Sequence, residues 1–409
     1  ISSMPCSLPS DETIPLGRFG TSHIGRSKSI YRMGLGHRYG RRMQTISGIH
    51  YNWSLPGVSS EDYFALIRNF RRHAFVLLYL FGASPALSPC FVEGREHRLQ
   101  PLGEGCKALY LPHATSLRMG RLGYQSDAQA TLAVSYNGLD GYARSLYEAL
   151  TRPYPAYEAV GVLNPGGEYN QLGTSLLQIE NEFYGTIRPK RTVRSGERPL
   201  DALRERGVEY VEVRLMDLDP FAPVGIAEQT MRLLDVFLLH CLLSDSPLDT
   251  PQEIAELKRN QHLTAERGRE PGLRLERGGQ SIALADWAAE ILAECVPLAA
   301  ALDRAQGGNA HAAALDHASS LIAAPEQTPS ARVLAELQGR HADNFTAFAL
   351  HRAEVARDHL LELPWTDAQQ QQFTAWAEQS LADQKAIEAA DSLPFEAWRQ
   401  QYMAIRPLA

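Results

Sequence analysis

The sequence predicts an α+β fold, and three observations predict it. Short runs of alternating apolar and polar residues, separated by Gly, Pro and Asn, occur between residues 20 and 220. Long helical patterns are interleaved with them, without the regular strand–helix alternation of a parallel sheet. From about residue 224 the chain is helical and rich in alanine. We therefore expect a single domain with a sheet-rich part over 1–223 and a mainly helical part over 224–409.

Strands are expected near 43–55, 175–184 and 207–216. In the first of these, apolar side chains alternate with polar ones, as they do along a strand with two unlike faces. The apolar face carries Ile49, Tyr51, Trp53 and Leu55, and the polar face carries Gln44, Gly48, His50, Asn52 and Ser54. His50 thus lies in the middle of a polar face, which is either simply solvated or part of a polar site.

Helices are expected over 60–80, which Gly82 and Pro85 terminate, and over 229–243, 283–305 and 345–363. The segment 229–243 is apolar nearly all round, so we expect it to be buried. Thr366 followed by Gln369 predicts a capping box that opens one more helix. The Gly-rich and charged stretches at 265–280 and 305–310 are expected to be surface loops.

Composition excludes several classes of protein. The chain has 409 residues, of which 44% are hydrophobic and 21% charged, with a net charge of −7, which argues against a dedicated nucleic-acid binder. Five cysteines without a CxxC pair indicate a reducing compartment, and we expect the cytoplasm. No apolar stretch approaches the roughly 20 residues of a membrane span, and no signal peptide is expected.

The third predicted strand, in GVEYVEVRLMDLDP (207–220), also has two unlike faces. Val211, Val213 and Leu215 share one face, whereas Glu212 and Arg214 point together from the other. These two residues form either an exposed ion pair, worth at most about 1 kcal/mol, or a site. In a site, the carboxylate would hold a hard cation such as Mg²⁺ and the guanidinium would bind phosphate oxygens.

The second predicted strand is rich in carboxylates and runs into a basic segment. Its polar face would carry Gln178, Glu180, Glu182 and Tyr184, and the basic residues that follow are Arg188, Lys190, Arg191, Arg194 and Arg198. The pattern suits a site where cations meet phosphate groups, or else a solvated loop. If the three strands are neighbours, their polar faces form one concave surface around His50.

Two further stretches pair Tyr with Arg near glycines. They are SIYRMGLGHRYG, with Tyr31 and Arg32, and LYLPHATSLRMGRLGY, with Arg118 and Tyr124. Arg can bind an amino-acid carboxylate through two hydrogen bonds, so these pairs are candidates for substrate contacts. Each is also compatible with a purely structural role.

Long blocks of the chain resemble the proteobacterial glutamate–cysteine ligase family. The matching blocks, in order, are SMPC (3–6), FGTSHIGRSKSIYRMGL (19–35), RYGRRMQTISGIHYNWSLP (38–56), YLFGASPA (79–86), YLPHATSLRMGRLGY (110–124), LQIENEFYGTIRPKR (177–191), SGERPLDAL (195–203) and GVEYVEVRLMDLDPFAPVGI (207–226). Weaker matches follow at 268–273, 329–334 and 388–398. The resemblance therefore covers essentially the whole chain.

The resemblance implies a glutamine-synthetase-like fold, in which a curved, mainly antiparallel sheet forms an active-site funnel. It also implies a cytoplasmic, monomeric ligase of glutathione biosynthesis whose partners are glutamate, cysteine and ATP, with Mg²⁺ or Mn²⁺. ATP phosphorylates the γ-carboxylate of glutamate, and the cysteine amine then attacks the γ-glutamyl phosphate. Such a phosphoryl transfer needs positive charge around the phosphates.

The resemblance also implies roles for individual residues. His50 and Glu212 resemble metal ligands, and Arg214 and Arg32 resemble catalytic phosphate contacts. The cysteine pocket would comprise Tyr31, Arg118, Tyr124 and Tyr184, with Arg118 binding the carboxylate of cysteine. Gln44 is implied as a substrate contact.

Two departures from the family pattern lead to further expectations. The family begins with about a hundred residues, including an acidic strand, that precede the part matched here, so we expect an incomplete metal shell and little or no activity of this chain alone. The loop after Leu55 has no cysteine, so Cys6 is expected to be a free thiol. Two alternatives remain open: a catalytically silent fragment that only binds ligands or partners, and a related ligase with another amine acceptor.

Overall fold

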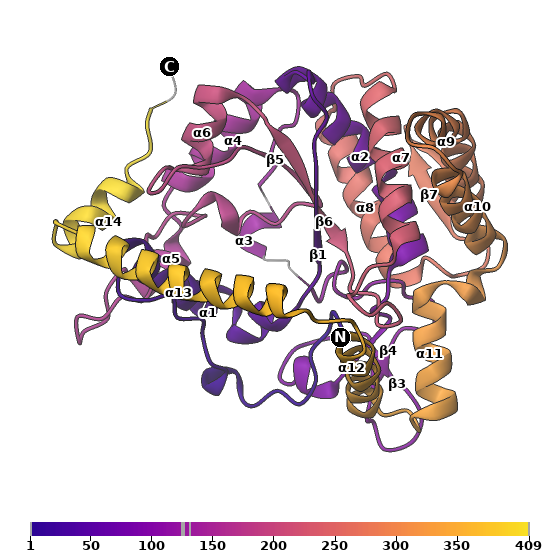
Figure 1. Cartoon of the computed structure of the whole chain (residues 1–409), viewed down its shortest axis with the longest axis horizontal. Helices are drawn as coiled ribbons and strands as arrows, with labels where there is room; N and C mark the ends of the chain where they lie inside the picture. Colours follow the sequence, from indigo (N-terminus) through magenta and orange to yellow (C-terminus); the bar gives the residue numbers. More distant parts are fainter. Residues whose placement is uncertain (1, 124–126, 131, 408–409) are drawn as a thin grey trace.

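The fold is built around a small antiparallel sheet. A computed structural model describes residues 2–123, 127–130 and 132–407. The sheet contains β1 (Ile49–Trp53), β5 (Ile187–Lys190) and β6 (Tyr210–Met216) in the order β1-β6-β5, and both pairings are antiparallel. Helices surround it on several sides (Figure 1). The expected α+β fold with an antiparallel sheet is confirmed.

A β-bulge interrupts the pairing of β1 with β6. Ile49 pairs with Met216 and Tyr51 with Val213, so Arg214 and Leu215 together lie opposite His50. A bulge bends the strand locally and redirects its side chains, and it leaves backbone groups outside the regular ladder. The bulge therefore falls at the two residues, His50 and Arg214, that the sequence had marked as site candidates.

The apolar face of the sheet packs on α2 (Ser60–Phe81), the main helix of the core. Val211, Val213 and Leu215 are at most 1% exposed, so this face is fully removed from water. α2 begins with a capping box between Ser59 and Asp62. Burial of one sheet face against α2 fixes the register of β6, so that its polar residues point the other way.

A layer of helices lies beyond α2, at the right of Figure 1. It contains α7 (Glu228–Leu243), α8 (Pro251–Arg267), α9 (Leu284–Gln306) and α10 (Ala310–Ala323). The helices expected at 60–80, 229–243, 283–305 and 345–363 are all present, and α7 is largely buried as its composition predicted. The capping box of Thr366 and Gln369 is also confirmed.

The remaining elements surround this framework. The helices are α1 (His23–Tyr39), α3 (Asp127–Ala130), α4 (Leu139–Thr151), α5 (Pro155–Val160), α6 (Pro199–Arg206), α11 (Pro329–Arg340), α12 (Phe345–Leu361), α13 (Asp367–Ala390) and α14 (Phe395–Met403). The strands are β2 (Ala86–Leu87), β3 (Gln100–Pro101) and β4 (Leu109–Tyr110) in a second sheet, and β7 (Arg274–Arg277) and β8 (Gln280–Ala283) in a hairpin. None of the helices in the described ranges has the length and apolarity needed to cross a bilayer.

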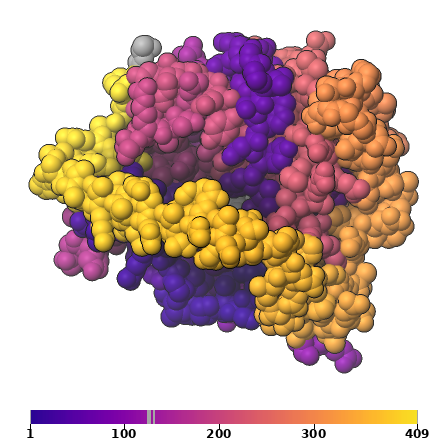
Figure 2. Space-filling model, viewed as in Figure 1, coloured from indigo at the N-terminus to yellow at the C-terminus, as the bar shows by residue number. Residues whose placement is uncertain are grey.

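α13 crosses one face of the molecule as a continuous band (Figure 2). It connects α12 to α14, and all its residues are exposed except Glu388, which is partly exposed. Glu388 accepts a hydrogen bond from the Thr21 amide at 2.9 Å, which ties the end of the band to the segment before α1.

Three expectations about secondary structure were wrong. The strand expected over 43–55 begins only at Ile49, after a 3-10 helix over Arg41–Thr45. The strand expected over 175–184 is irregular and ends in a 3-10 turn, Glu180–Glu182, and the third strand of the sheet is β5 instead. The stretch 265–280, expected to be a loop, contains the end of α8 and the β7–β8 hairpin, whose turn uses two glycines with positive φ, Gly278 and Gly279.

The irregular conformation of 175–184 has a physical cause in its buried carboxylates. Glu182 accepts hydrogen bonds from Arg38 at 2.9 Å and Tyr39 at 2.6 Å, and also from the backbone amide of Gln178 at 2.7 Å. Glu180 forms a buried ion pair with Arg198 at 2.9 Å. Because these contacts turn the carboxylates toward α1 and the start of α6, the segment cannot alternate as a strand. The expected row of site carboxylates is therefore structural.

Candidate active site

The polar face of the sheet centres on Glu212. Its Oε2 accepts a hydrogen bond from Nη1 of Arg214 at 2.8 Å and lies 3.5 Å from Nζ of Lys190. Its Oε1 lies 3.7 Å from Nδ1 of His50. Arg188 on β5 pairs in register with Glu212. One carboxylate thus shares this face with three cationic side chains and an imidazole.

The surrounding charges shift the pKa values of the face. Burial raises the pKa of Glu212, but Lys190 and Arg214 lower it by more, so the net pKa lies below its ordinary value. Burial and then Arg214 lower the pKa of His50. At neutral pH Glu212 is therefore ionised and His50 is neutral. The face carries a surplus of positive charge, which suits a polyanionic ligand such as a nucleotide phosphate group.

Arg188 is the least satisfied of these cations. It is 4% exposed, its Nη2 donates to the backbone oxygen of Asn181 at 3.1 Å, and its Nε is buried without a hydrogen-bond partner in the described part of the chain. Burial, followed by the charge of Arg214, lowers its pKa. A buried guanidinium with an unused donor is costly until an anion accepts from it. Arg188 and Lys190 belong to the basic segment of the sequence, and they lie on strand β5 rather than in a loop. Their spacing of two residues in IRPK is the feature of the sequence that indicates a strand.

Arg118 holds the bulge of β6 in place. Its Nη2 donates to the carbonyl oxygens of Leu215 at 2.5 Å and Arg214 at 3.3 Å, which are the two bulged residues. Its Nε donates to Oδ1 of Asp217 at 2.7 Å, and both partners of this pair are buried. The other oxygen of Asp217 accepts from Ser84 Oγ at 2.7 Å. The guanidinium therefore satisfies carbonyls that the bulge withdraws from the ladder.

Gly48 leaves the space that Arg118 occupies. A Cβ at this position would lie 2.7 Å from Nη1 of Arg118 and 2.9 Å from the carbonyl oxygen of Met216. Gly48→Ala should therefore displace the guanidinium or the end of β6. We expect kcat/KM to fall by about 10- to 100-fold, because sub-ångström shifts in positioning groups have effects of this order.

The control for Gly48→Ala is Gly339→Ala in α11, where an added Cβ meets nothing within 4 Å. That variant should keep wild-type kinetics and should not be destabilised, since Ala is favoured over Gly inside a helix. Steady-state kinetics and thermal melting of both variants check the expectation. Unchanged activity of Gly48→Ala would show that the position of Arg118 is not critical.

A pocket extends from this polar face toward α2 and α8. Its lining includes Gly48, His50, Arg118 and Arg214 from the sheet and its surroundings, the segment 183–186, and Arg71 and Arg72 of α2. Arg118 and Arg214 thus line the pocket as well as shaping β6. Four arginines line the pocket, two beside the sheet and two on α2, which again favours a ligand with more than one anionic group.

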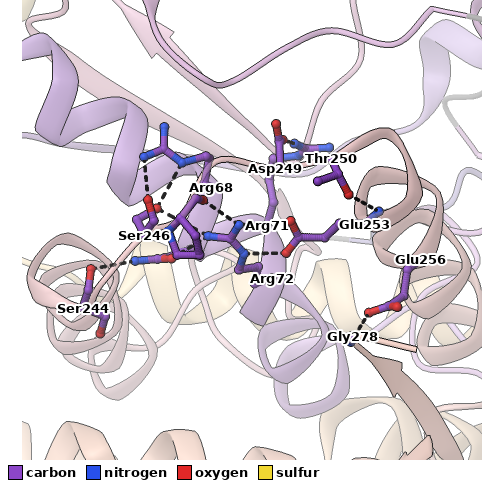
Figure 3. Close-up of polar contacts among 12 residues, drawn as sticks. Arg68, Arg71, Arg72, Ser244, Ser246, Asp249, Thr250, Glu253, Glu256 and Gly278 are labelled. Atoms are coloured by element: carbon purple, nitrogen blue, oxygen red, sulfur yellow. Dashed lines mark hydrogen bonds and ion pairs between the residues drawn. The ribbon is translucent and has the colours of Figure 1, made fainter. Parts of the chain in front are cut away.

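The arginines of α2 are held in fixed positions. In Figure 3, Arg68, Arg71 and Arg72 reach from one side of α2 to the loop that joins α7 to α8. Arg71 forms an ion pair with Asp249 at 2.8 Å, and Arg72 one with Glu253 at 2.6 Å. Arg68 donates to Ser246 Oγ at 3.1 Å. These contacts fix the wall of the pocket. Their partners lie about 180 residues away along the chain, so local sequence patterns do not indicate them.

The other predicted site residues come from α1 and its surroundings. Tyr31 and Arg32 lie on α1, and burial raises the pKa of Tyr31, with a further contribution from the nearby Tyr184, which lines the pocket. Gln44 donates from Nε2 to the backbone oxygen of Arg32 at 3.0 Å, so it anchors α1 at this point. Tyr124 lies outside the described residues.

Glu212 and His50 offer two ligand atoms that could hold a hard cation. Oε1 of Glu212 takes no part in the contacts with Arg214 and Lys190, and it faces Nδ1 of His50 at 3.7 Å. One oxygen and one neutral nitrogen at this separation can be two neighbouring ligands of one ion. Mg²⁺ prefers about six ligands, so phosphate oxygens and water would complete the set. The pair therefore fits a cation that binds together with a phosphorylated substrate.

Comparison with known proteins gives a consistent family assignment. The family model described as glutamate-cysteine ligase matches residues 1–264. Glutamate–cysteine ligases from Azotobacter vinelandii and Alcanivorax borkumensis are 49% and 46% identical to the chain, over 98% of it and 79% and 80% of their own lengths. A glutamate–cysteine ligase from Francisella tularensis, solved in complex with AMP, is 35% identical with a TM-score of 0.91, over 98% of this chain and 81% of that one. A bifunctional glutathione synthetase from Pasteurella multocida, 21% identical with a TM-score of 0.62, shares the fold alone.

The family match and the fold shared with the Francisella tularensis enzyme place the protein among the carboxylate–amine ligases. The protein is thus an enzyme that joins two small molecules, and the alternative of a chain that only binds ligands or partners is not favoured. The chain belongs to the glutamate–cysteine ligase family, as the sequence blocks had predicted.

Proposed function

We propose that this protein catalyses the ATP-dependent joining of the γ-carboxylate of glutamate to the amine of cysteine, which is the first step of glutathione biosynthesis. The observation that carries the proposal is the polar sheet face, where Arg188, Lys190 and Arg214 surround the single carboxylate of Glu212. Such a surplus of fixed positive charge suits the transfer of a phosphoryl group, which develops negative charge on the phosphate oxygens.

The reaction proceeds in two steps. A γ-carboxylate oxygen of glutamate attacks the terminal phosphorus of ATP, and the bond to the departing ADP breaks. The amine of cysteine then attacks the carbonyl carbon of the acyl phosphate, inorganic phosphate leaves with the electron pair of the C–O bond, and the amine loses a proton. In this proposal Arg214 and Arg32 contact phosphate oxygens. Neutralisation of the leaving groups by fixed guanidinium groups favours both steps.

The remaining predicted residues are assigned to the substrates. Arg118, Tyr184 and Tyr31 would form the cysteine pocket together with Tyr124, and Gln44 would position α1 or contact a substrate. Most of the donors of Arg118 are used by Asp217 and the bulge. Nη1 donates one long hydrogen bond to the carbonyl oxygen of Arg214 at 3.4 Å and faces Gly48, so its second N–H is the donor that would reach a carboxylate. Arg118 thus combines a positioning role with a substrate contact.

His50 and Glu212 would hold a divalent cation, Mg²⁺ or Mn²⁺, that accompanies ATP. When bound, such a cation neutralises phosphate charge and orients the terminal phosphate. Because Glu212 is ionised and His50 neutral, both are in the protonation state that a metal ligand requires. We further propose a monomeric protein of the cytoplasm, where ATP and reduced cysteine are available.

The test is a coupled assay of phosphate release with ATP, Mg²⁺, glutamate and cysteine, together with mass detection of γ-glutamylcysteine. Phosphate and product should appear in equal amounts and only when all four components are present. α-Aminobutyrate, which has a methyl group in place of the thiol, and serine test the acceptor. A clear preference for another amine would identify a ligase with a different acceptor, and ATP turnover without a ligated product would contradict the proposal.

A further inference from the structure

A second group of potential ligands lies in the helical core, outside the polar sheet face. His73 of α2 meets His240 and Cys241 of α7, and one ligand atom of each lies within 4.8 Å of those of the other two. His240 is 4% exposed and Cys241 is fully buried. The catalytic proposal above makes no use of any of these three side chains.

The imidazole nitrogens of this group have unused lone pairs. Nε2 of His240 lies 2.8 Å from Oε2 of Glu294 on α9, so Nε2 faces this carboxylate and Nδ1 is the ring nitrogen that could act as a ligand. That Nδ1 is buried without a hydrogen-bond partner among the described residues, and so is Nδ1 of His73. Buried polar atoms normally have partners, so two orphaned nitrogens beside one thiol call for a ligand.

The charges around the group permit a cation. Burial, with contributions from His240, Arg72 and Arg277, lowers the pKa of His73 to about 3, so its ring is neutral. Arg72 is paired with Glu253, and Arg277 with Glu290, so these neighbours contribute little net positive charge. Burial raises the pKa of Cys241, and the nearby thiol of Cys295 on α9 raises it further. Without a bound cation both thiols are therefore protonated.

We propose that His73, His240 and Cys241 form a binding site for a divalent cation of the zinc class. Two imidazoles and one thiolate are a donor set that Zn²⁺ favours over Mg²⁺. The carboxylate of Glu294 contacts the ring nitrogen of His240 that faces away from the ion and orients the imidazole, an arrangement typical of histidine ligands. Cys241 releases its thiol proton to solvent when the ion binds, and a water supplies the fourth position.

The site requires only small movements to close. Ligand atoms around a tetrahedral Zn²⁺ are about 3.3–3.6 Å apart, given Zn–N and Zn–S distances of about 2.0 and 2.3 Å. The ligand atoms of His73, His240 and Cys241 lie within 4.8 Å of one another. Changes of side-chain rotamer would bring them to these shorter separations. Glu294 is 63% exposed in its side chain, so the site lies near the surface and an ion can reach it. The bound ion would link α2 to α7, which are packed together behind the sheet.

The first experiment uses the full chain, stripped of metals and then titrated with Zn²⁺ in the presence of excess Mg²⁺. We expect one Zn²⁺ per chain, a higher melting temperature in its presence, and an X-ray absorption spectrum with sulfur and nitrogen in the first shell. With Co²⁺ we expect the intense thiolate-to-metal charge-transfer band of a four-coordinate site. Zinc bound with only oxygen and nitrogen neighbours, or no binding, would overturn the proposal.

Variants locate the ion without disturbing the catalytic face. Glu294→Gln should weaken Zn²⁺ binding by about 10- to 100-fold, the usual effect of losing a second-shell carboxylate. Its control is Asp286→Asn, an exposed residue two turns earlier on α9, which should leave binding unchanged. Cys241→Ser should abolish the cobalt charge-transfer band, whereas Cys90→Ser should not. Equal loss of binding in Asp286→Asn and Glu294→Gln, or retention of the band in Cys241→Ser, would place the ion elsewhere.

Discussion

Glu212→Gln should lower kcat by about 100-fold or more while the fold is retained. Glu212 is the carboxylate at the centre of the polar face, and its two oxygens have different partners. Oε2 holds Arg214 and Lys190, and Oε1 faces His50. Replacing the carboxylate by an amide removes the charge that orders the cations and one ligand of the proposed metal. Losses of 10²–10³ are typical when one group that stabilises a phosphoryl or acyl transition state is removed.

The matched control for this variant is Glu209→Gln. Glu209 lies just before β6 and is exposed; it forms a loose ion pair with Arg191 at 3.7 Å and accepts a hydrogen bond from the backbone amide of Thr192 at 2.9 Å, which a Gln oxygen can also accept. The Glu209→Gln variant should retain near wild-type kinetics, since exposed ion pairs contribute little to the stability of the fold. Far-ultraviolet circular dichroism and thermal melting verify the fold of both proteins, and initial rates at varied Mg²⁺ separate metal binding from turnover. Near-normal turnover of Glu212→Gln at all Mg²⁺ concentrations would disprove the assigned role.

The sequence predicted the two strands that carry the catalytic candidates because each has one purely apolar face. Burial of Val211, Val213 and Leu215 against α2 leaves no alternative register for β6, and so the orientation of Glu212 follows from the pattern alone. The same reasoning failed for 175–184. There the alternation of Leu177 with Gln178 and of Ile179 with Glu180 matches a strand. However, the Gln178 side chain donates to the backbone oxygen of Tyr31 on α1, and Glu180 pairs with Arg198 at the start of α6.

The roles of single residues were harder to predict than their location. Arg188 and Lys190 looked like part of a basic loop, yet they form one polar row of β5 beside Glu212. The bulge that gives Arg214 and His50 their directions leaves no mark in the sequence, because it arises from the pairing of β1 with β6. Likewise, the partners of Arg71 and Arg72 are brought close only by the packing of α2 against the loop before α8. Tertiary contacts of this kind are not encoded in local periodicity.

Arg118→Lys should affect stability and catalysis together, because Arg118 binds both the bulge and Asp217. A lysine supplies one compact charge and cannot donate at once to Asp217 and to the carbonyl oxygens of Arg214 and Leu215, as the planar guanidinium does. We expect the free energy of unfolding to fall by about 2 kcal/mol, the scale of one or two charge-assisted hydrogen bonds. The bulge would then relax and shift Arg214 relative to the bound phosphates.

Kinetic constants distinguish this positioning role from a substrate contact alone. In Arg118→Lys we expect kcat to fall at least about tenfold because Arg214 is misplaced, together with a higher KM for cysteine. Asp217→Asn, which leaves Arg118 in place but weakens its anchor, should lower kcat with less effect on that KM. Arg121→Lys is the control: Arg121 belongs to the same segment but is 62% exposed in its side chain, and it should behave like the wild type. If Arg118→Lys raised only the KM for cysteine and left the melting temperature and kcat unchanged, Arg118 would be a substrate contact and would have no part in holding the bulge.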